Sequence, residues 1–185
     1  MGRLILITGG ARSGKSTFAE STAKSLGENV LYVATAIPVD GEMRARIKRH
    51  REQRPANWVT IEAHRDLHAF IKPEVYGKCA VLIDCITVMI TNILFDENVN
   101  WENAEDGDIA DLESRVNIQI GNLLDLVKDM EIVFILVTNE LGMGMVPEYY
   151  SGRVFRDIAG RVNQRLASAA DEVYFCVSGI PLRIK

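Results

Sequence analysis

The stretch GGARSGKS, residues 9–16, has the spacing G-x-x-x-x-G-K-[ST] that is typical of a phosphate-binding loop. In such a loop, backbone N–H groups and the N-terminus of the following helix face the phosphate oxygens. Lys15 would reach the β- and γ-phosphates, and the Ser16 hydroxyl would bind Mg²⁺. The motif therefore predicts binding of a nucleoside triphosphate. The residues expected to contact the triphosphate are Gly9, Gly10, Ala11, Arg12, Ser13, Gly14, Lys15 and Ser16.

A carboxylate partner for the metal is expected in AVLIDC, residues 80–85, where Asp84 follows four apolar residues. This is the pattern of a Walker B aspartate, so Ser16 and Asp84 are the candidate Mg²⁺ ligands. The alternative is a carboxylate that ends a strand without touching a metal. Triphosphate binding alone does not separate a kinase, a GTPase switch, an ATPase motor and a transferase.

His50 lies in a basic stretch, RIKRHREQRPANW, residues 46–58, and three interpretations of it remain open. It could be an ordinary exposed residue of a polar helix, or part of a nucleic-acid patch. It could also be a nucleophile, because a neutral imidazole attacks phosphorus readily and nearby cations disfavour imidazolium. The same cations could stabilise charge developing on phosphoryl oxygens. The surrounding basic residues are Arg44, Arg46, Lys48, Arg49, Arg51 and Arg54.

Composition predicts one globular domain, residues 1–185, with 48% hydrophobic and 25% charged residues. The net charge of −4 argues against a protein that coats nucleic acid. The apolar run near Met1 is too short for a signal peptide, and no run is long enough to span a membrane. Cys79, Cys85 and Cys176 show no metal-binding spacing, so we expect reduced cysteines in a cytoplasmic protein.

Continuous apolar runs predict a parallel sheet that is covered on both faces. Amphipathic helices are expected between the runs, at residues 15–26, 108–129 and 153–171, and a loop at 96–108. The alternation of strands and helices predicts an α/β fold: a single P-loop NTPase domain, RecA-like, with a mostly parallel sheet flanked by helices. The predicted strands lie within residues 4–8, 29–35, 58–63, 80–86, 132–139 and 172–179.

Several longer stretches make the chain resemble one enzyme family. They include EMRARIKRHREQRPANW (42–58), TNELGMGMVPE (138–148) and FRDIAGRVNQRLA (155–167), in that order. The chain resembles the bifunctional adenosylcobinamide kinase/adenosylcobinamide-phosphate guanylyltransferases of cobalamin biosynthesis over nearly its whole length. The resemblance implies that a nucleoside triphosphate phosphorylates adenosylcobinamide. It also implies that GTP guanylylates a histidine, which passes GMP to adenosylcobinamide phosphate.

By position, the resemblance makes His50 the GMP carrier and Lys15 a catalytic residue of the phosphate loop. It implies Mg²⁺ and GTP as cofactors, with ATP possible for the kinase step. Asp84 stands where some members have glutamate, so its role as direct ligand, water-mediated ligand or base stays open. The further nucleotide-binding residues that it implies are Ala34, Thr35, Ala36, Arg51, Glu52, Gln53, Arg54, Glu62 and Asp84.

Other expectations concern partners and alternatives. Adenosylcobinamide and GTP are the expected partners, with no nucleic acid and no membrane insertion, and the resemblance suggests a homo-oligomer such as a trimer. Asn139 and Glu140 end a predicted strand, so they either face the site or only cap the sheet edge.

A kinase without the guanylyl step and a nucleotide-dependent switch or assembly protein remain alternatives. One loop grips the β- and γ-phosphates while His50 must attack the α-phosphorus, so either the nucleotide takes two poses or the His50 helix moves.

Overall fold

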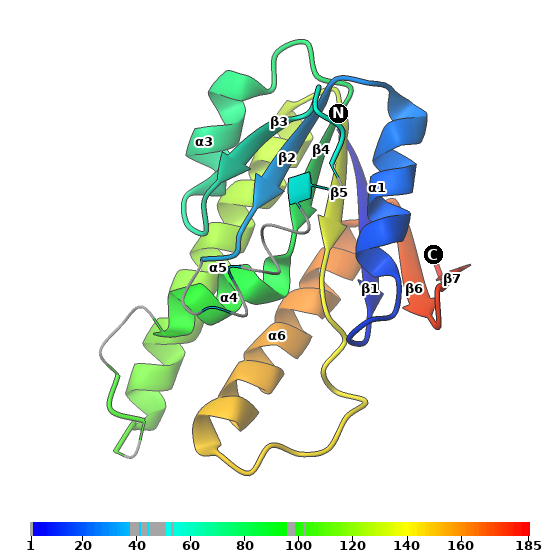
Figure 1. Ribbon diagram of the computed structural model, residues 1–185. Coiled ribbons are helices and arrows are strands. Elements are labelled where there is room, and N and C mark those ends of the chain that lie inside the picture. Colours follow the sequence, from blue (N-terminus) through cyan, green and yellow to red (C-terminus); the bar gives the residue numbers. More distant parts are fainter. Residues whose placement is uncertain are drawn as a thin grey trace.

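The computed structural model describes residues 2–37, 41, 44, 51–52, 54–95, 99–101 and 103–185. Its centre is a seven-stranded sheet in the order β3-β2-β4-β5-β1-β6-β7 (Figure 1). The strands are β1 (Arg3–Gly9), β2 (Val30–Ala34), β3 (Val59–Glu62), β4 (Ala80–Asp84), β5 (Val133–Val137), β6 (Glu172–Val177) and β7 (Ile180–Arg183). The labelled helices are α1 (Lys15–Leu26), α3 (Leu67–Glu74), α4 (Ile86–Phe95), α5 (Asp106–Asp129) and α6 (Tyr150–Ala169).

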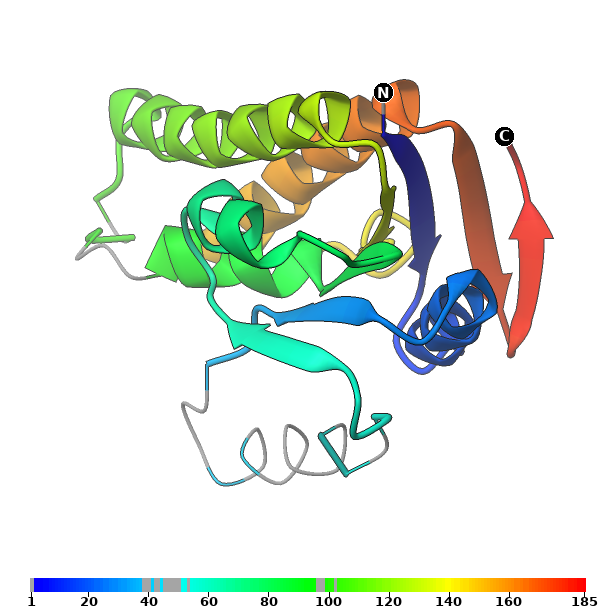
Figure 2. The same cartoon turned by 90° about the horizontal axis from the view of Figure 1, so that it is seen from above.

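Helices cover the sheet on both faces, as the continuous apolar runs predict. Figure 2 shows α1 on one face and α3, α4, α5 and α6 on the other. Side chains of β1 alternate between the two layers: Leu4 and Leu6 join the core under α4, α5 and α6, whereas Ile5 and Ile7 join the core under α1. In the order of the sheet, every neighbouring pair of strands from β3 through β2, β4, β5 and β1 to β6 is parallel, which confirms the predicted mostly parallel α/β fold.

Two local expectations were wrong, and one strand was missed. The run at 58–63 forms β3, an edge strand in which Val59, Thr60 and Glu62 are exposed, because only β2 pairs with it. The antiparallel strand β7 was not expected. Helix α5 begins at Asp106, inside the predicted loop, because Glu105 and Asp108 form a reciprocal capping box. Among the helices of the described residues, none combines the length and the apolar character needed to cross a bilayer.

A two-residue turn joins β6 to β7. Val177 pairs with Ile180, and both turn residues have positive φ, 51° for Ser178 and 84° for Gly179. Positive φ at both positions is the conformation of a type I′ hairpin turn, whose twist matches that of the strands. The turn thereby directs β7 back along β6 at the edge of the sheet.

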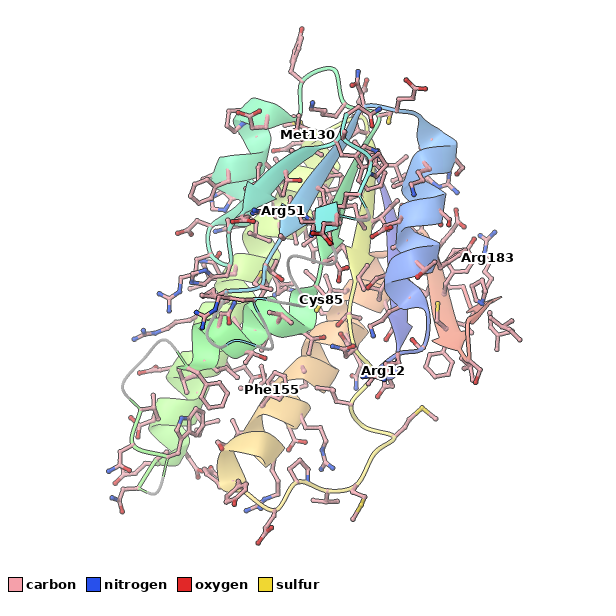
Figure 3. The ribbon with its side chains drawn as sticks, in the orientation of Figure 1. Arg12, Arg51, Cys85, Met130, Phe155 and Arg183 are labelled. Atoms are coloured by element: carbon pink, nitrogen blue, oxygen red, sulfur yellow. The ribbon has the colours of Figure 1, made fainter. Side chains whose placement is uncertain are left out.

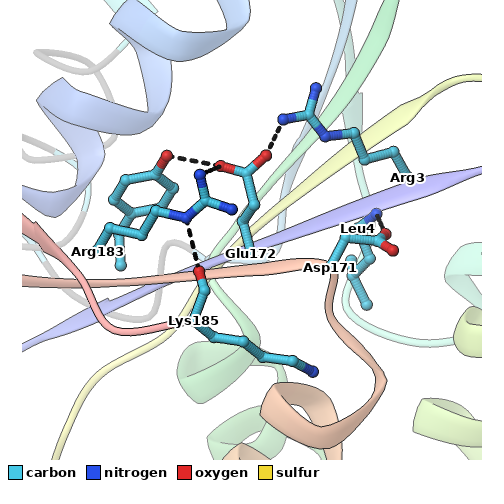
Figure 4. Close-up of polar contacts among 7 residues, drawn as sticks. Arg3, Leu4, Asp171, Glu172, Arg183 and Lys185 are labelled. Carbon is cyan, nitrogen blue, oxygen red and sulfur yellow. Dashed lines mark hydrogen bonds and ion pairs between the residues drawn. The ribbon is translucent and has the colours of Figure 1, made fainter.

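The amino-terminal half of β6 is tied to its neighbours by Glu172, whose residue surface is only 5% exposed (Figure 4). Its carboxylate forms ion pairs with Arg3 of β1 and Arg183 of β7, and it accepts a 2.6 Å hydrogen bond from the Tyr174 hydroxyl. A buried carboxylate is stable only when such partners replace water. Glu172 therefore links β1, β6 and β7.

Replacing Glu172 should loosen this edge of the sheet. We expect Glu172→Ala to lower the free energy of unfolding by about 2 kcal/mol, because charge-assisted hydrogen bonds are lost. Urea denaturation measures the change. Glu74→Ala, which removes an exposed carboxylate at the end of α3, is the control and should change stability by less than about 0.5 kcal/mol. Equal effects of the two variants would contradict the assigned role of Glu172.

Candidate active site

The phosphate-loop motif connects β1 to α1, as its spacing predicts (Figure 1). Within it, the Ser13 N–H donates to the Gly10 carbonyl at 3.3 Å. Lys15 is buried, and its Nζ donates to the same Gly10 carbonyl at 3.0 Å. The loop thus folds back on its own lysine, which is the first residue of α1. A helix N-terminus in this position favours an anion.

Two glycines of the loop are required by close approach. A Cβ on Gly9 would lie 2.6 Å from both the Cys176 carbonyl oxygen and the Ser13 Oγ. Gly14 is the N-cap of α1 with φ of 89°, and a Cβ there would lie 2.9 Å from the Cα of Gly179. A side chain at either position would force the backbone apart. The spacing of the motif therefore reflects contacts of this fold.

The hairpin turn between β6 and β7 supports the loop from outside. The Gly179 N–H donates to the Ser13 carbonyl at 2.9 Å. This contact joins residues far apart in the chain, and the sequence analysis missed it. The dipeptide Ser178–Gly179 is typical of a turn, but it gives no sign of the contact with Ser13.

Several predicted site residues lie in one row across the sheet. The strand register aligns Glu62 with Ala34, Ala34 with Asp84, Asp84 with Val137 and Val137 with Ile7. All of them except Ile7, which lies two residues before the end of β1, are the last residues of their strands, and open parallel sheets bind ligands at that end. Figure 3 shows Arg12 and Cys85 toward this end and Met130 at the opposite end.

Asp84 is held by an aromatic neighbour. The Tyr32 hydroxyl donates to the Asp84 Oδ2 at 3.1 Å, and the Trp58 ring stacks on Tyr32 at 6.3 Å between centroids. Burial, followed by the charge of Asp84, raises the pKa of Tyr32, which keeps its hydroxyl protonated as a donor. The Arg54 guanidinium carbon lies 3.6 Å from the Tyr32 ring centroid, a cation–π contact. Tyr32 thus connects Asp84 to the segment that follows His50, and sequence reasoning missed it.

Thr35 fixes the ends of β2 and β4 to each other. Its hydroxyl donates to the Cys85 carbonyl at 2.8 Å and accepts the Cys85 N–H at 2.9 Å. Asn92 of α4 donates to the Thr35 carbonyl at 2.7 Å. Burial, followed by Asp84, raises the pKa of Cys85 to about 12, so this thiol stays protonated near neutral pH. The hydrogen bonds of Thr35 give it a positioning role, and a direct contact between Thr35 and nucleotide stays a prediction.

The remaining predicted residues fall partly outside the described part of the chain. His50 and Gln53 lie outside it. Arg51 forms an ion pair with Glu62, both more than half exposed, and Glu52 is exposed. Exposed ion pairs contribute little stability, so this pair can separate readily when a charged ligand arrives. Among the described residues, no group of three or more His, Cys, Asp or Glu side chains is arranged to hold a metal.

Comparisons with known proteins identify the family of this chain. A model of the family described as cobinamide kinase / cobinamide phosphate guanyltransferase matches residues 5–184. The chain belongs to this family. The match confirms the resemblance drawn from the longer sequence motifs.

Curated relatives span the same length. The bifunctional adenosylcobalamin biosynthesis protein CobU of Salmonella typhimurium is 48% identical over 183 residues, covering 98% of this chain and 99% of the relative. The protein of the same name from Escherichia coli K12 is 45% identical over 182 residues, with the same coverage. The bifunctional adenosylcobalamin biosynthesis protein CobP of Pseudomonas aeruginosa is 38% identical over 180 residues, covering 97% and 96%.

The close approach of Gly14 to the hairpin gives a prediction for this cobinamide kinase family member. We expect Gly14→Ala to lower the free energy of unfolding by about 1–2 kcal/mol, because alanine disfavours positive φ. A displaced loop should also weaken GTP binding about tenfold. Urea denaturation and isothermal titration calorimetry measure the two effects.

Gly10→Ala is the comparison for stability, since no heavy atom lies within 4 Å of an added Cβ there. We expect Gly10→Ala to lower the free energy of unfolding by less than half as much as Gly14→Ala does. An equal loss in the two variants would show that the contact with Gly179 does not constrain the loop.

Proposed function

We propose that this chain phosphorylates adenosylcobinamide with a nucleoside triphosphate and then transfers GMP from GTP to the product through His50. The observation that carries the proposal is a folded phosphate loop within a chain whose family match runs from residue 5 to residue 184. The names of the curated relatives, which describe bifunctional adenosylcobalamin biosynthesis proteins, support the same activity.

In the kinase step, residues 9–16 hold the triphosphate and Lys15 binds its β- and γ-phosphates. The acceptor hydroxyl oxygen attacks the γ-phosphorus, and the bond from that phosphorus to the β–γ bridging oxygen breaks. Lys15 is suited to this role because its buried ammonium already bonds inside the loop, where phosphate oxygens can replace the Gly10 carbonyl.

Ser16 and Asp84 are the proposed Mg²⁺ ligands. A hydroxyl at the start of α1 and a carboxylate at the end of β4 are oxygen donors, which Mg²⁺ prefers. Mg²⁺ commonly takes only one or two protein ligands beside phosphates and water. When bound, the ion neutralises charge that develops on the phosphate oxygens.

In the guanylyl step, a neutral His50 nitrogen attacks the α-phosphorus of GTP, and pyrophosphate leaves as the bond to the α–β bridging oxygen breaks. A phosphate oxygen of adenosylcobinamide phosphate then attacks the same phosphorus, and the P–N bond breaks. The basic neighbours Arg51 and Arg54 are proposed to face the phosphates. The contact between Arg54 and Tyr32 supports this, because it brings the segment after His50 to the neighbourhood of Asp84.

The proposal extends to assembly and location. Exposed apolar side chains on the edge hairpin, Val177, Ile180 and Leu182, support a homo-oligomer in which they are covered. The use of GTP, and of ATP where it serves as phosphate donor, supports a cytoplasmic location.

A covalent intermediate gives the sharpest test. We expect the protein incubated with GTP and Mg²⁺, without corrinoid, to gain the mass of one GMP in an intact mass spectrum. The adduct should be labile to acid, as a phosphorus–nitrogen bond is, and absent from His50→Ala.

His68→Ala, which changes a histidine of α3, is the matched control and should keep the adduct. Folded, GTP-binding protein without any adduct would contradict the guanylyl step. Phosphorylation of adenosylcobinamide would then decide whether the chain is a kinase only.

A further inference from the structure

A pocket of about 630 Å³ lies beside the phosphate loop, between α6 and the strands β1 and β6. It is on the sheet face opposite α1, because the Leu6 side chain that lines it belongs to the core under α4, α5 and α6. The volume suits a group of drug size and is too small for a whole corrinoid with its side chains. Its lining includes Thr8, Glu140, Gly142, Arg156, Gly160 and Gln164.

Thr8 marks the floor of the pocket as a polar binding position. The residue is 9% exposed, and its Oγ1 is buried with no hydrogen-bond partner among the described residues. A buried hydroxyl without a partner is destabilising, and because the oxygen itself is covered, it would bond a ligand atom once the side chain turns toward the pocket. Thr8 directly precedes Gly9, so a group bonded to Thr8 lies next to the phosphate loop.

Glu140 brings a carboxylate to the same place. Its backbone N–H donates to the Gly9 carbonyl at 3.0 Å, which docks the segment after β5 against the first residue of the loop. Its Oε1 accepts the Gly142 N–H at 2.8 Å, and its side chain lines the pocket. The backbone of Glu140 is thereby docked on the start of the phosphate loop, and its carboxylate is held at the pocket.

A buried polar network fixes this position. The Asn139 N–H donates to the Thr87 Oγ1 at 2.6 Å, and the Asn163 side-chain amide donates to the Asn139 carbonyl at 2.9 Å. The Thr138 hydroxyl donates to the Asn163 Oδ1 at 2.7 Å, so Thr87 is the donor in its 3.0 Å bond to Thr138. These hydrogen bonds hold the backbone before Glu140 in a fixed position.

We propose that this pocket receives the hydroxyl-bearing arm of the corrinoid acceptor and that Glu140 is the general base of the kinase step. This inference rests on the proposed kinase function. The proton of the acceptor hydroxyl passes to the Glu140 carboxylate as the oxygen bonds to the γ-phosphorus, and the diphosphate leaves. Glu140 later releases the proton to water. Thr8 Oγ1 bonds a polar atom of the arm, and Arg156 and Gln164 face its amide groups.

The chemistry of the lining fits an arm of this kind. An alcohol flanked by amides needs both donors and acceptors, and the pocket supplies guanidinium, carboxamide, hydroxyl and carboxylate groups. Arg156 lines the pocket with 22% of its side chain exposed, and its Nε lies 3.7 Å from the Oδ1 of the exposed Asp157. The Arg156 charge suits the phosphate which the arm carries after the first reaction.

Glu140→Gln tests the base directly, because glutamine keeps the acceptor for the Gly142 N–H and removes the proton-accepting carboxylate. We expect kcat for phosphorylation of adenosylcobinamide to fall at least about 100-fold. Formation of the GMP adduct from GTP alone should stay within about twofold of the unmodified protein, because it needs no acceptor. Thr8→Val should raise KM for adenosylcobinamide about tenfold through the lost hydrogen bond.

Glu148→Gln is the matched control, because it changes an exposed carboxylate of the same loop that does not line the pocket. It should leave both reactions within about twofold. If Glu140→Gln phosphorylates adenosylcobinamide at a near-normal rate, this inference is overturned and the proposed function stands. The same holds if the variant loses adduct formation as strongly as phosphorylation, because that result would indicate a disturbed loop. An unmodified protein that phosphorylates no adenosylcobinamide would overturn the proposed function and this inference with it.

Discussion

The parallel pairing of neighbouring strands is the constraint on which the site depends. Because β1 to β6 all run in one direction, their carboxyl ends meet at a single edge of the sheet. The register then sets Glu62, Ala34 and Asp84 in one row. The phosphate loop leaves β1 at the same edge. Chemistry-bearing residues from distant parts of the sequence are brought together without any special local structure.

Strand β5 lies between the phosphate-loop strand and the strand that ends in Asp84, and it divides the site into two sides. On one side, Tyr32 joins Asp84 to Arg54 and so to the segment after His50. On the other side, Glu140 is joined to Gly9 and faces the pocket under α6. In the proposed function, the first side serves guanylyl transfer, and the second holds the phosphate loop and receives the acceptor. This separation would let one phosphate loop support attack at two different phosphorus atoms.

Local sequence patterns were sufficient for the features that depend on neighbours in the chain. Buried parallel strands read as continuous apolar runs, and the phosphate loop is defined by its own spacing. The edge strands were the weak point. The apolar run of β3 predicted a buried strand, although β3 is exposed at the sheet edge. Strand β7, which contains Pro181, carries no strand pattern. The contacts of Tyr32 with Asp84, of Gly179 with Ser13 and of Asn163 with Asn139 join residues more than 20 positions apart, so no local signal could have revealed them.

The most direct test of the central claim, covalent transfer of GMP from a nucleotide held by the phosphate loop, is isotope exchange between pyrophosphate and GTP. The protein would be incubated with GTP, Mg²⁺ and labelled pyrophosphate, without corrinoid. A reversible bond between His50 and the α-phosphorus predicts that label enters GTP, and that His50→Ala abolishes the exchange. Absence of exchange in folded protein that binds GTP would contradict the account.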